Sequence, residues 1–201
     1  MIRQSEKSED DRQVWTALKR GDRDALNSIF NSHYLSLYHY GVKLCKDESL
    51  VKDCLQDLFI YIYDNRENLS DVEVIRYYLF KAFRRRLMDQ LQKNRRWSYR
   101  DHQSLEVYLK PSEVEIDKNE EIRRKELLTK MINKLPARQK ELIYLRYYKE
   151  MPLEEIAKIL SMSYRSVVNT LYRAMTRLRQ DQPALRKLEY FLFPVLYYCL
   201  I

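Results

Sequence analysis

Apolar residues recur at helical spacing through most of the chain and predict an all-α protein. Residues 11–94 contain four such segments, with breaks at residues 21–22, 46–49 and 68–71, where polar residues gather. Asp22 or Asp24 is placed to cap the second segment. The third and fourth segments, at about residues 50–66 and 72–94, have on their inner sides Val51, Cys54, Leu55, Leu58 and Ile62, and Leu79, Phe83, Leu87 and Leu91, respectively.

A second helical block covers residues 122–179. Its first helix is expected to bury Leu127, Leu128, Met131, Ile132 and Leu135, and its second, starting at Pro136, to bury Leu142, Ile143, Leu145 and Tyr147. Between the two blocks the periodicity is lost, and the acidic residues that gather there indicate a linker.

The end of the chain, residues 189–201, is strongly apolar but too short to span a membrane as a helix. Because an exposed apolar patch of this size normally finds a partner surface, we expect the tail to pack on the protein. Capping of the core is the favoured arrangement, and packing between the two helical blocks as a restraint on their activity is the alternative.

The most informative stretch is the end of the second block, which has the pattern of a helix-turn-helix. Apolar residues fall at i, i+3, i+4 and i+7 in residues 153–160, and residues 161–163 interrupt the period. Ser163 is a good N-cap for a second helix, which would bury Val167, Leu171, Ala174, Met175 and Leu178. Its outer face would present polar side chains that can reach base edges and phosphates in a major groove. Periodicity alone fits an ordinary helical hairpin equally well.

Composition supports a helical protein with an anionic partner. The chain of 201 residues has two glycines and five prolines and a formal net charge of +8. Its three cysteines lack the spacing of a metal site and are interpreted as reduced thiols, and the polar N-terminus is unlike a signal peptide. These observations predict a cytoplasmic protein.

The fourth segment combines cations with aromatic residues. Nine lysines and arginines lie between Arg76 and Arg100, interleaved with Tyr77, Tyr78, Phe80, Phe83, Trp97 and Tyr99. This pattern suits binding of a single nucleic-acid strand. Its bases would stack on the aromatic rings, and the lysines and arginines would follow its phosphates. The plainer interpretation is a helix with an apolar core face and a solvated basic face, and we expect both on opposite sides.

The preceding segment is acidic on its outer side. Asp53 and Asp57 are one helical turn apart with Gln56 beside them, a like-charge spacing that mildly destabilises a helix. A basic partner surface would explain this spacing, although a solvated face fits about equally well.

In this order, the motifs resemble the extracytoplasmic-function (ECF) sigma factors, the compact initiation factors of bacterial RNA polymerase. In region 2 of that family, D-x-x-Q-[DE]-x-F is matched by residues 53–59, an aromatic-leucine-aromatic-basic run by residues 78–81, and D-x-L by residues 89–91. In region 4, the matching segments are residues 135–136 (L-P), 145–147 (L-R-Y), 155–157 (E-I-A) and 173–179 (R-A-x-x-x-L-R). Each motif is weak alone, but all of them in order form a specific signal over residues 14–179.

The resemblance implies two small helical domains joined by a linker. Region 2 would occupy residues 10–97, the acidic linker residues 98–121, the region 4 helix-turn-helix residues 122–182 and the apolar extension residues 183–201. The implied partners are core RNA polymerase, through its β′ and β subunits, promoter DNA and an anti-sigma factor, without membrane insertion. The resemblance implies no enzymatic activity, and the sequence indicates no catalytic residue, metal site or cofactor.

Family roles are carried over onto matching positions. Core polymerase would be bound by Asp53, Gln56, Asp57 and Phe59. The −10 promoter element would be opened and held by Arg76, Tyr78, Lys81, Arg84, Arg85, Lys93, Arg95 and Arg96, together with the loop of residues 68–74. The −35 element would be read by Ser163, Tyr164, Arg165, Ser166, Asn169, Thr170, Arg173 and Arg177.

Other functions fit the sequence less well. A stand-alone helix-turn-helix regulator would not need the acidic D-x-x-Q-D element. An enzyme would need a catalytic constellation, and two glycines cannot build a phosphate-binding loop. The chain departs from the family pattern in three places: Ser161 replaces a glycine of the turn, residues 168–170 replace a Lys-Ser-Arg run, and Arg85 replaces an asparagine. Promoter specificity is therefore expected to differ.

Overall fold

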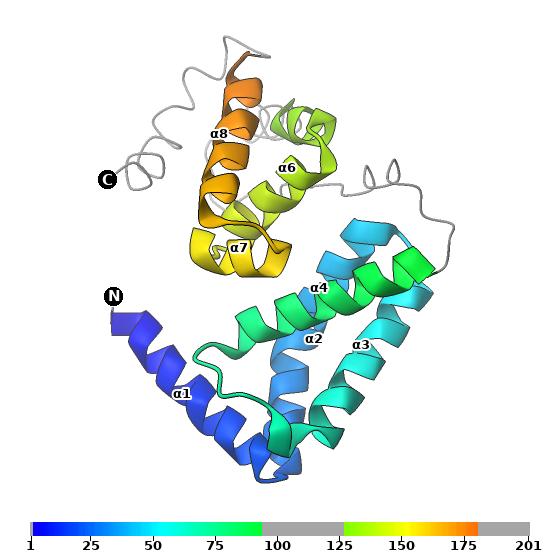
Figure 1. Cartoon of the computed structure of the whole chain (residues 1–201), viewed down its shortest axis with the longest axis vertical. Coiled ribbons are helices and arrows are strands. Elements are labelled where there is room, and N and C mark those ends of the chain that lie inside the picture. The colour runs from blue at the N-terminus through cyan, green and yellow to red at the C-terminus, as the bar shows by residue number, and fades with distance from the viewer. Residues whose placement is uncertain (1, 94–126, 181–201) are drawn as a thin grey trace, which may run out of the picture. The chain divides into compact units, whose positions relative to one another are not determined.

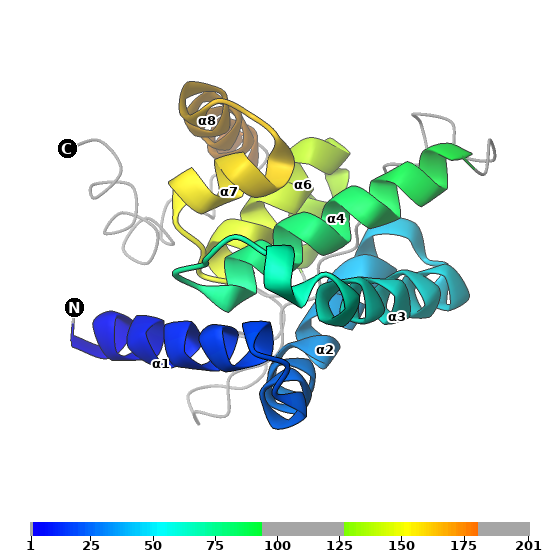
Figure 2. The ribbon, with the colours of Figure 1, turned by 60° about the horizontal axis from the view of Figure 1, so that its bottom comes forward.

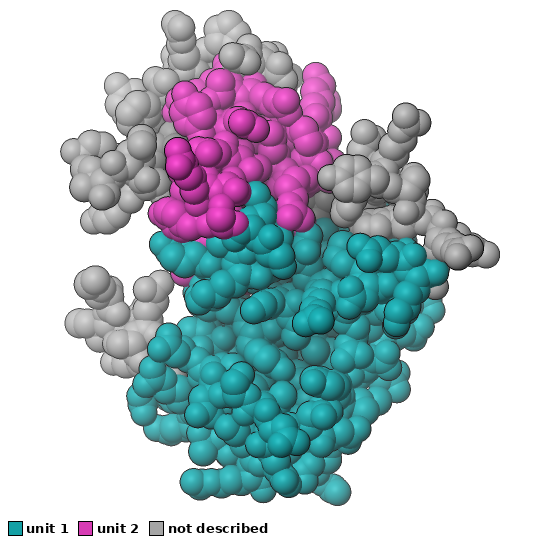
Figure 3. Space-filling view, viewed as in Figure 1, with its two compact units in different colours: residues 1–105, 154–162 teal, residues 106–153, 163–201 magenta. Residues whose placement is uncertain are grey.

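The structure, a computed structural model, describes residues 2–93 and 127–180. The chain divides into two compact units (Figure 3). The first comprises Met1–Leu105 with Glu154–Met162, and the second comprises Glu106–Leu153 with Ser163–Ile201. The described part is helical, as predicted (Figure 1). The predicted linker and apolar tail lie outside the described residues, and the predicted domain boundaries stay a prediction.

Four helices and a short 3₁₀ turn build the first unit before the chain leaves it. They are α1 (Ile2–Lys19), α2 (Arg23–Cys45), α3 (Glu48–Asp64), η1 (Arg66–Asn68) and α4 (Ile75–Lys93). Asp22 caps α2 by accepting from the backbone N–H groups of Asp24 and Ala25. Asp47 caps α3 by accepting from the Leu50 N–H at 3.0 Å. The predicted breaks are therefore confirmed, although α4 begins at Ile75, later than expected.

The core of this unit lies where α2, α3 and α4 approach one another. The predicted inner residues of α3 and α4 are all buried. Gly41 permits the closest approach, because a Cβ at this position would lie 2.7 Å from Phe83 Cζ on α4 and 2.9 Å from Val51 Cγ1 on α3. A glycine in a helix interior costs stability, so its presence here is explained by packing.

The second unit contains helical residues 127–134, α6 (Ala137–Ile143), the π-helical turn η3 (Tyr144–Tyr148) and α8 (Tyr164–Gln180). Leu142, Ile143 and Leu145 are buried as predicted, but Tyr144 is buried where Tyr147 was expected. The π turn explains this difference, because its wider hydrogen bonds, such as Lys149 N–H to Tyr144 O at 3.0 Å, rotate the following residues.

The helix α7 (Leu153–Leu160) belongs to the first unit, except for its first residue, and is joined to α8 by residues 161–163. Ser161 has a φ of +52°. The Ser161 N–H donates to Lys158 O and the Met162 N–H donates to Ala157 O, which together form a Schellman motif. Ser161 therefore adopts the left-handed conformation that glycine usually supplies in this turn.

Candidate polymerase and nucleic-acid interfaces

The outward face of α3 carries the acidic residues predicted to meet the polymerase. Asp53, Gln56 and Asp57 are exposed on this face. Phe59 is only 6 % exposed and packs edge-on against Phe30 of α2, with ring centroids 5.0 Å apart. Its side chain supports the helix from inside. Ile60, which is 50 % exposed, lies one turn beyond Asp57 and was missed by the sequence analysis.

Cys54 lies on the buried side of α3, where its surroundings favour the protonated thiol. Burial, followed by the nearby Asp57 carboxylate, raises the pKa of Cys54 from 9.0 to about 11. Cys54 is therefore a packing residue that stays a neutral thiol at physiological pH.

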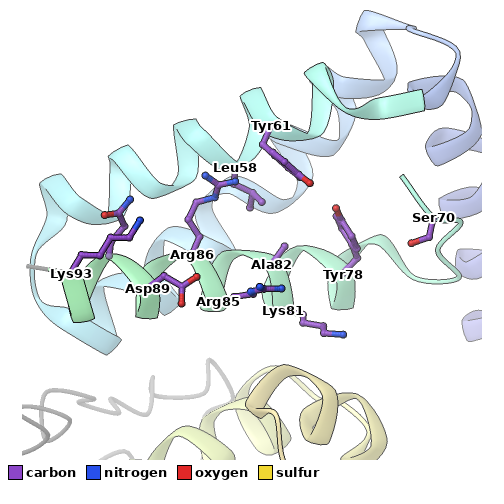
Figure 4. Close-up of a pocket in the computed structure, with 11 residues that line it drawn as sticks. Leu58, Tyr61, Ser70, Tyr78, Lys81, Ala82, Arg85, Arg86, Asp89 and Lys93 are labelled. Atoms are coloured by element: carbon purple, nitrogen blue, oxygen red, sulfur yellow. The ribbon is translucent and has the colours of Figure 1, made fainter. Parts of the chain in front are cut away.

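A cavity of about 600 Å³ opens between α3 and α4 (Figure 4). Its aromatic walls are Tyr61 of α3 and Tyr78 of α4, whose hydroxyl ends point toward one another. Ser70, from the segment between η1 and α4, closes one end. Burial, followed by the charge of Tyr61, raises the pKa of Tyr78, so its phenol is neutral at physiological pH.

The cavity is also lined by basic residues, with Asp89 among them. Lys81, Arg85 and Lys93 are exposed residues of α4 that line it. Arg86 also lines it, 4.0 Å from the Asp57 carboxylate and with its guanidinium 5.4 Å from the centre of the Tyr61 ring. This site combines rings with cations, which are the two features that a single nucleic-acid strand requires.

The predicted −10 residues are only partly brought together. Tyr78, Lys81, Arg85 and Lys93 line the cavity, and Arg76 lies in the first turn of α4. Arg84 is 8 % exposed and belongs to the buried side of the helix, and Arg95 and Arg96 lie outside the described residues. Arg84 falls in the apolar stripe with Phe80 and Leu87, a spacing that could have identified its position.

Ser70 belongs to the predicted −10 loop of residues 68–74, whereas Tyr61 and Arg86 were absent from the predicted −10 set. No local sequence pattern identifies Tyr61 and Arg86, because they lie on α3 and α4, which meet only in the folded unit.

The helix α8 presents most of the side chains predicted to read duplex DNA. Ser163 caps it, accepting from the Ser166 N–H at 3.1 Å, with the two hydroxyl oxygens 2.8 Å apart. Tyr164, Arg165, Asn169 and Arg173 are exposed. The predicted inner residues of α8 are all buried.

Two predicted α8 residues are engaged within the chain, and one exposed residue was missed. Thr170 donates its hydroxyl to Ser166 O at 2.7 Å, and Arg177 lies 3.4 Å from the Gln139 side-chain oxygen. Tyr172 is 67 % exposed and lies seven residues beyond Arg165, on the same side of the helix.

Comparison with known families identifies the chain. Residues 29–97 match the family model for Sigma-70 region 2, and residues 125–178 match that for Sigma-70, region 4. The chain belongs to the sigma-70 family. It is an ECF-type RNA polymerase sigma factor that acts in transcription initiation, so the resemblance seen in its sequence motifs is confirmed.

Several relatives align over most of the sigma factor. RNA polymerase sigma factor SigV of Bacillus subtilis (strain 168) is 24 % identical over 161 residues, covering 80 % of this chain and 93 % of SigV. ECF RNA polymerase sigma factor SigM of the same organism is 25 % identical, covering 77 % and 93 %. RNA polymerase sigma-E factor of Streptomyces coelicolor is 28 % identical, covering 69 % and 75 %.

The solved structure of CnrH in complex with the cytosolic domain of CnrY has a similar fold. Its TM-score is 0.57 at 20 % sequence identity, over 85 % of this chain and 95 % of the matched chain of that structure. In the part of the chain that the structure describes, no helix is long and apolar enough to cross a membrane.

Proposed function

We propose that this sigma factor divides promoter recognition between two surfaces and reaches the polymerase through a third. The exposed face of α3 with Asp53, Gln56, Asp57 and Ile60 binds basic and apolar groups on the β′ subunit of core polymerase. Phe59 supports that face from inside. The outer face of α8 enters the major groove of the −35 element.

The cavity between α3 and α4 is the observation that carries the proposal. A base taken out of the stack loses a few kcal/mol of stacking and pairing, about 2–4 kcal/mol, which the receiving pocket has to offset. Tyr61 and Tyr78 offer aromatic surface, and Lys81, Arg85 and Lys93 offer charge for the adjoining phosphates. We therefore assign to the cavity one unstacked base of the non-template −10 strand.

Further partners follow from the relatives. CnrH is bound to the cytosolic domain of CnrY, which supports an anti-sigma factor as a partner of this chain. We propose no enzymatic activity for this chain, because bond formation belongs to the polymerase. We place the protein in the cytoplasm with that enzyme.

Run-off transcription with purified core polymerase on genomic fragments tests the proposal. Lys81→Ala with Arg85→Ala is expected to abolish permanganate-reactive thymines in the −10 region while core binding stays unchanged. Arg20→Ala removes an exposed cation of the same unit outside the cavity and serves as the matched control. Normal opening with the double variant would refute the cavity assignment.

Duplex recognition is tested separately. Arg165→Ala with Arg173→Ala should weaken binding of the −35 duplex and reduce the salt dependence of that binding by about one unit of slope per lost phosphate contact. An unchanged slope would show that α8 does not lie against the duplex.

A further inference from the structure

One side of α1 contacts the segment between η1 and α4, which contributes Ser70 to the cavity. Residues 69–74, between η1 and α4, run beside α1 in both views (Figures 1 and 2). Three α1 residues spaced four apart, Asp11, Trp15 and Lys19, share one face of the helix. Each contacts this segment or the first residue of α4.

The three contacts have different chemistry. The Trp15 indole N–H donates to the backbone oxygen of Ser70 at 3.0 Å. The Lys19 ammonium lies 2.6 Å from the Asp71 carboxylate. Asp11 accepts from the Ile75 N–H at 3.0 Å, so a residue 64 positions earlier in the chain serves the first turn of α4. A carboxylate at a helix N-terminus is also favoured by the helix dipole.

Trp15 connects two walls of the cavity. Besides its bond to the Ser70 backbone, its ring packs edge-on against Tyr78, with centroids 5.0 Å apart, and it is 1 % exposed. Ser70 and Tyr78 both line the cavity, whereas Trp15 does not. A buried donor that loses its acceptor is costly, so the indole fixes the position of the segment relative to α4.

We propose that Trp15, assisted by Asp11 and Lys19, is a positioning residue for −10 recognition, which sets the distance between the Ser70 and Tyr78 walls before DNA arrives. This inference rests on the proposed function of the cavity. A site that is already formed does not have to be ordered when the base enters, and that saving appears as tighter binding. The helix α1 thus acts on the −10 strand without touching it.

The test uses the full chain bound to core polymerase and a fluorescent single-stranded oligonucleotide. The oligonucleotide carries the non-template −10 strand of a promoter found by run-off transcription. A series of oligonucleotides places one abasic site at each position in turn. With wild-type protein, the position whose base enters the cavity is the one where loss of the base weakens binding most.

Trp15→Phe keeps one aromatic six-membered ring in the core and removes the five-membered ring with its N–H donor. We expect it to weaken binding of the intact strand about fivefold, the effect of one lost hydrogen bond. At the abasic position that matters most in wild type, variant and wild type should bind equally, because no base remains to be positioned. A merely structural defect would weaken binding of every oligonucleotide equally, and that result would overturn the inference, as would unchanged binding.

Two further variants keep the test independent of folding. Asp71→Asn removes the exposed ion pair with Lys19 and should give a smaller loss, of about twofold, at the same position. Gln13→Ala, on the exposed side of α1, is the matched control and should bind as wild type does. If no abasic site weakens wild-type binding, the base-binding role of the cavity fails; if one does but Trp15→Phe shows no position-dependent loss, only the positioning role fails.

Discussion

Gly41→Ala tests how tightly the first unit is packed. The new Cβ would lie 2.7 Å from Phe83 Cζ and 2.9 Å from Val51 Cγ1, whereas carbon atoms attract best at about 3.5–4.0 Å. Phe83 and Val51 are fully buried on different helices, so α4 and α3 must both move. Overpacking of this kind costs about 1–3 kcal/mol, against a gain of about 1 kcal/mol in helix propensity. We expect a net destabilisation of about 1–2 kcal/mol, from a packing cost at the upper end.

Hydrogen exchange followed by mass spectrometry measures this effect within one unit. Slowly exchanging amides of α2 should exchange roughly 5–30-fold faster in Gly41→Ala, because their exchange requires the first unit to open. Peptides from α6 and α8 provide an internal control and should be unaffected. In a Phe83→Leu background, which removes the nearest ring atom, the same substitution should cost less. Slower or unchanged α2 exchange in Gly41→Ala would refute the packing argument.

Three other predictions concern the turn, the buried thiol and the recognition helix. Ser161→Gly should stabilise the helix-turn-helix by about 0.5–1 kcal/mol, since a non-glycine residue pays about 1–2 kcal/mol for the left-handed conformation and glycine loses part of that gain in entropy; slower α8 amide exchange checks it, and faster exchange would contradict it. With its pKa raised to about 11 and its side chain only 2 % exposed, Cys54 should react with iodoacetamide at pH 8 at least about 100-fold more slowly than in the unfolded chain, because a lower thiolate fraction and burial both slow the reaction. Site-resolved mass spectrometry measures that rate at each pH, and labelling should accelerate as the pH approaches 11; equal rates at pH 8 would exclude the shift. Tyr172→Ala should weaken binding of the −35 duplex about fivefold through loss of an apolar contact, measured by fluorescence anisotropy, and unchanged affinity would place Tyr172 away from the DNA.

Helical periodicity predicted the inner faces of α3, α4 and α8 correctly, because burial there follows a single repeat along one helix. The cap of α8 at Ser163 was predictable for the same reason, since capping is a local interaction. The family resemblance also marked Ser161 as a departure, because it stands where the turn usually has glycine. It could not show that this residue adopts the left-handed conformation.

The sequence analysis was less accurate where position depends on other elements. The start of α4 at Ile75 involves Asp11 on another helix, which no local pattern reveals. The half-buried position of Tyr147, where burial was expected, follows a π turn that shifts the repeat by a fraction of a turn. The cavity draws on α3, α4 and the segment between η1 and α4, so its tyrosine and serine walls could be assembled only from the folded unit.

The basic character of α4 therefore explains only part of its proposed role. Lys81 and Arg85 can attract any polyanion, and that attraction weakens with salt in the same way for every sequence. A pocket whose walls keep their spacing when it is empty does not have to be ordered when the base enters. In this sigma factor the Ser70 wall has no regular secondary structure of its own, and its bond to Trp15 comes from a helix that does not line the cavity. Selectivity at −10 should consequently respond to substitutions in α1 that leave every cavity-lining cation in place.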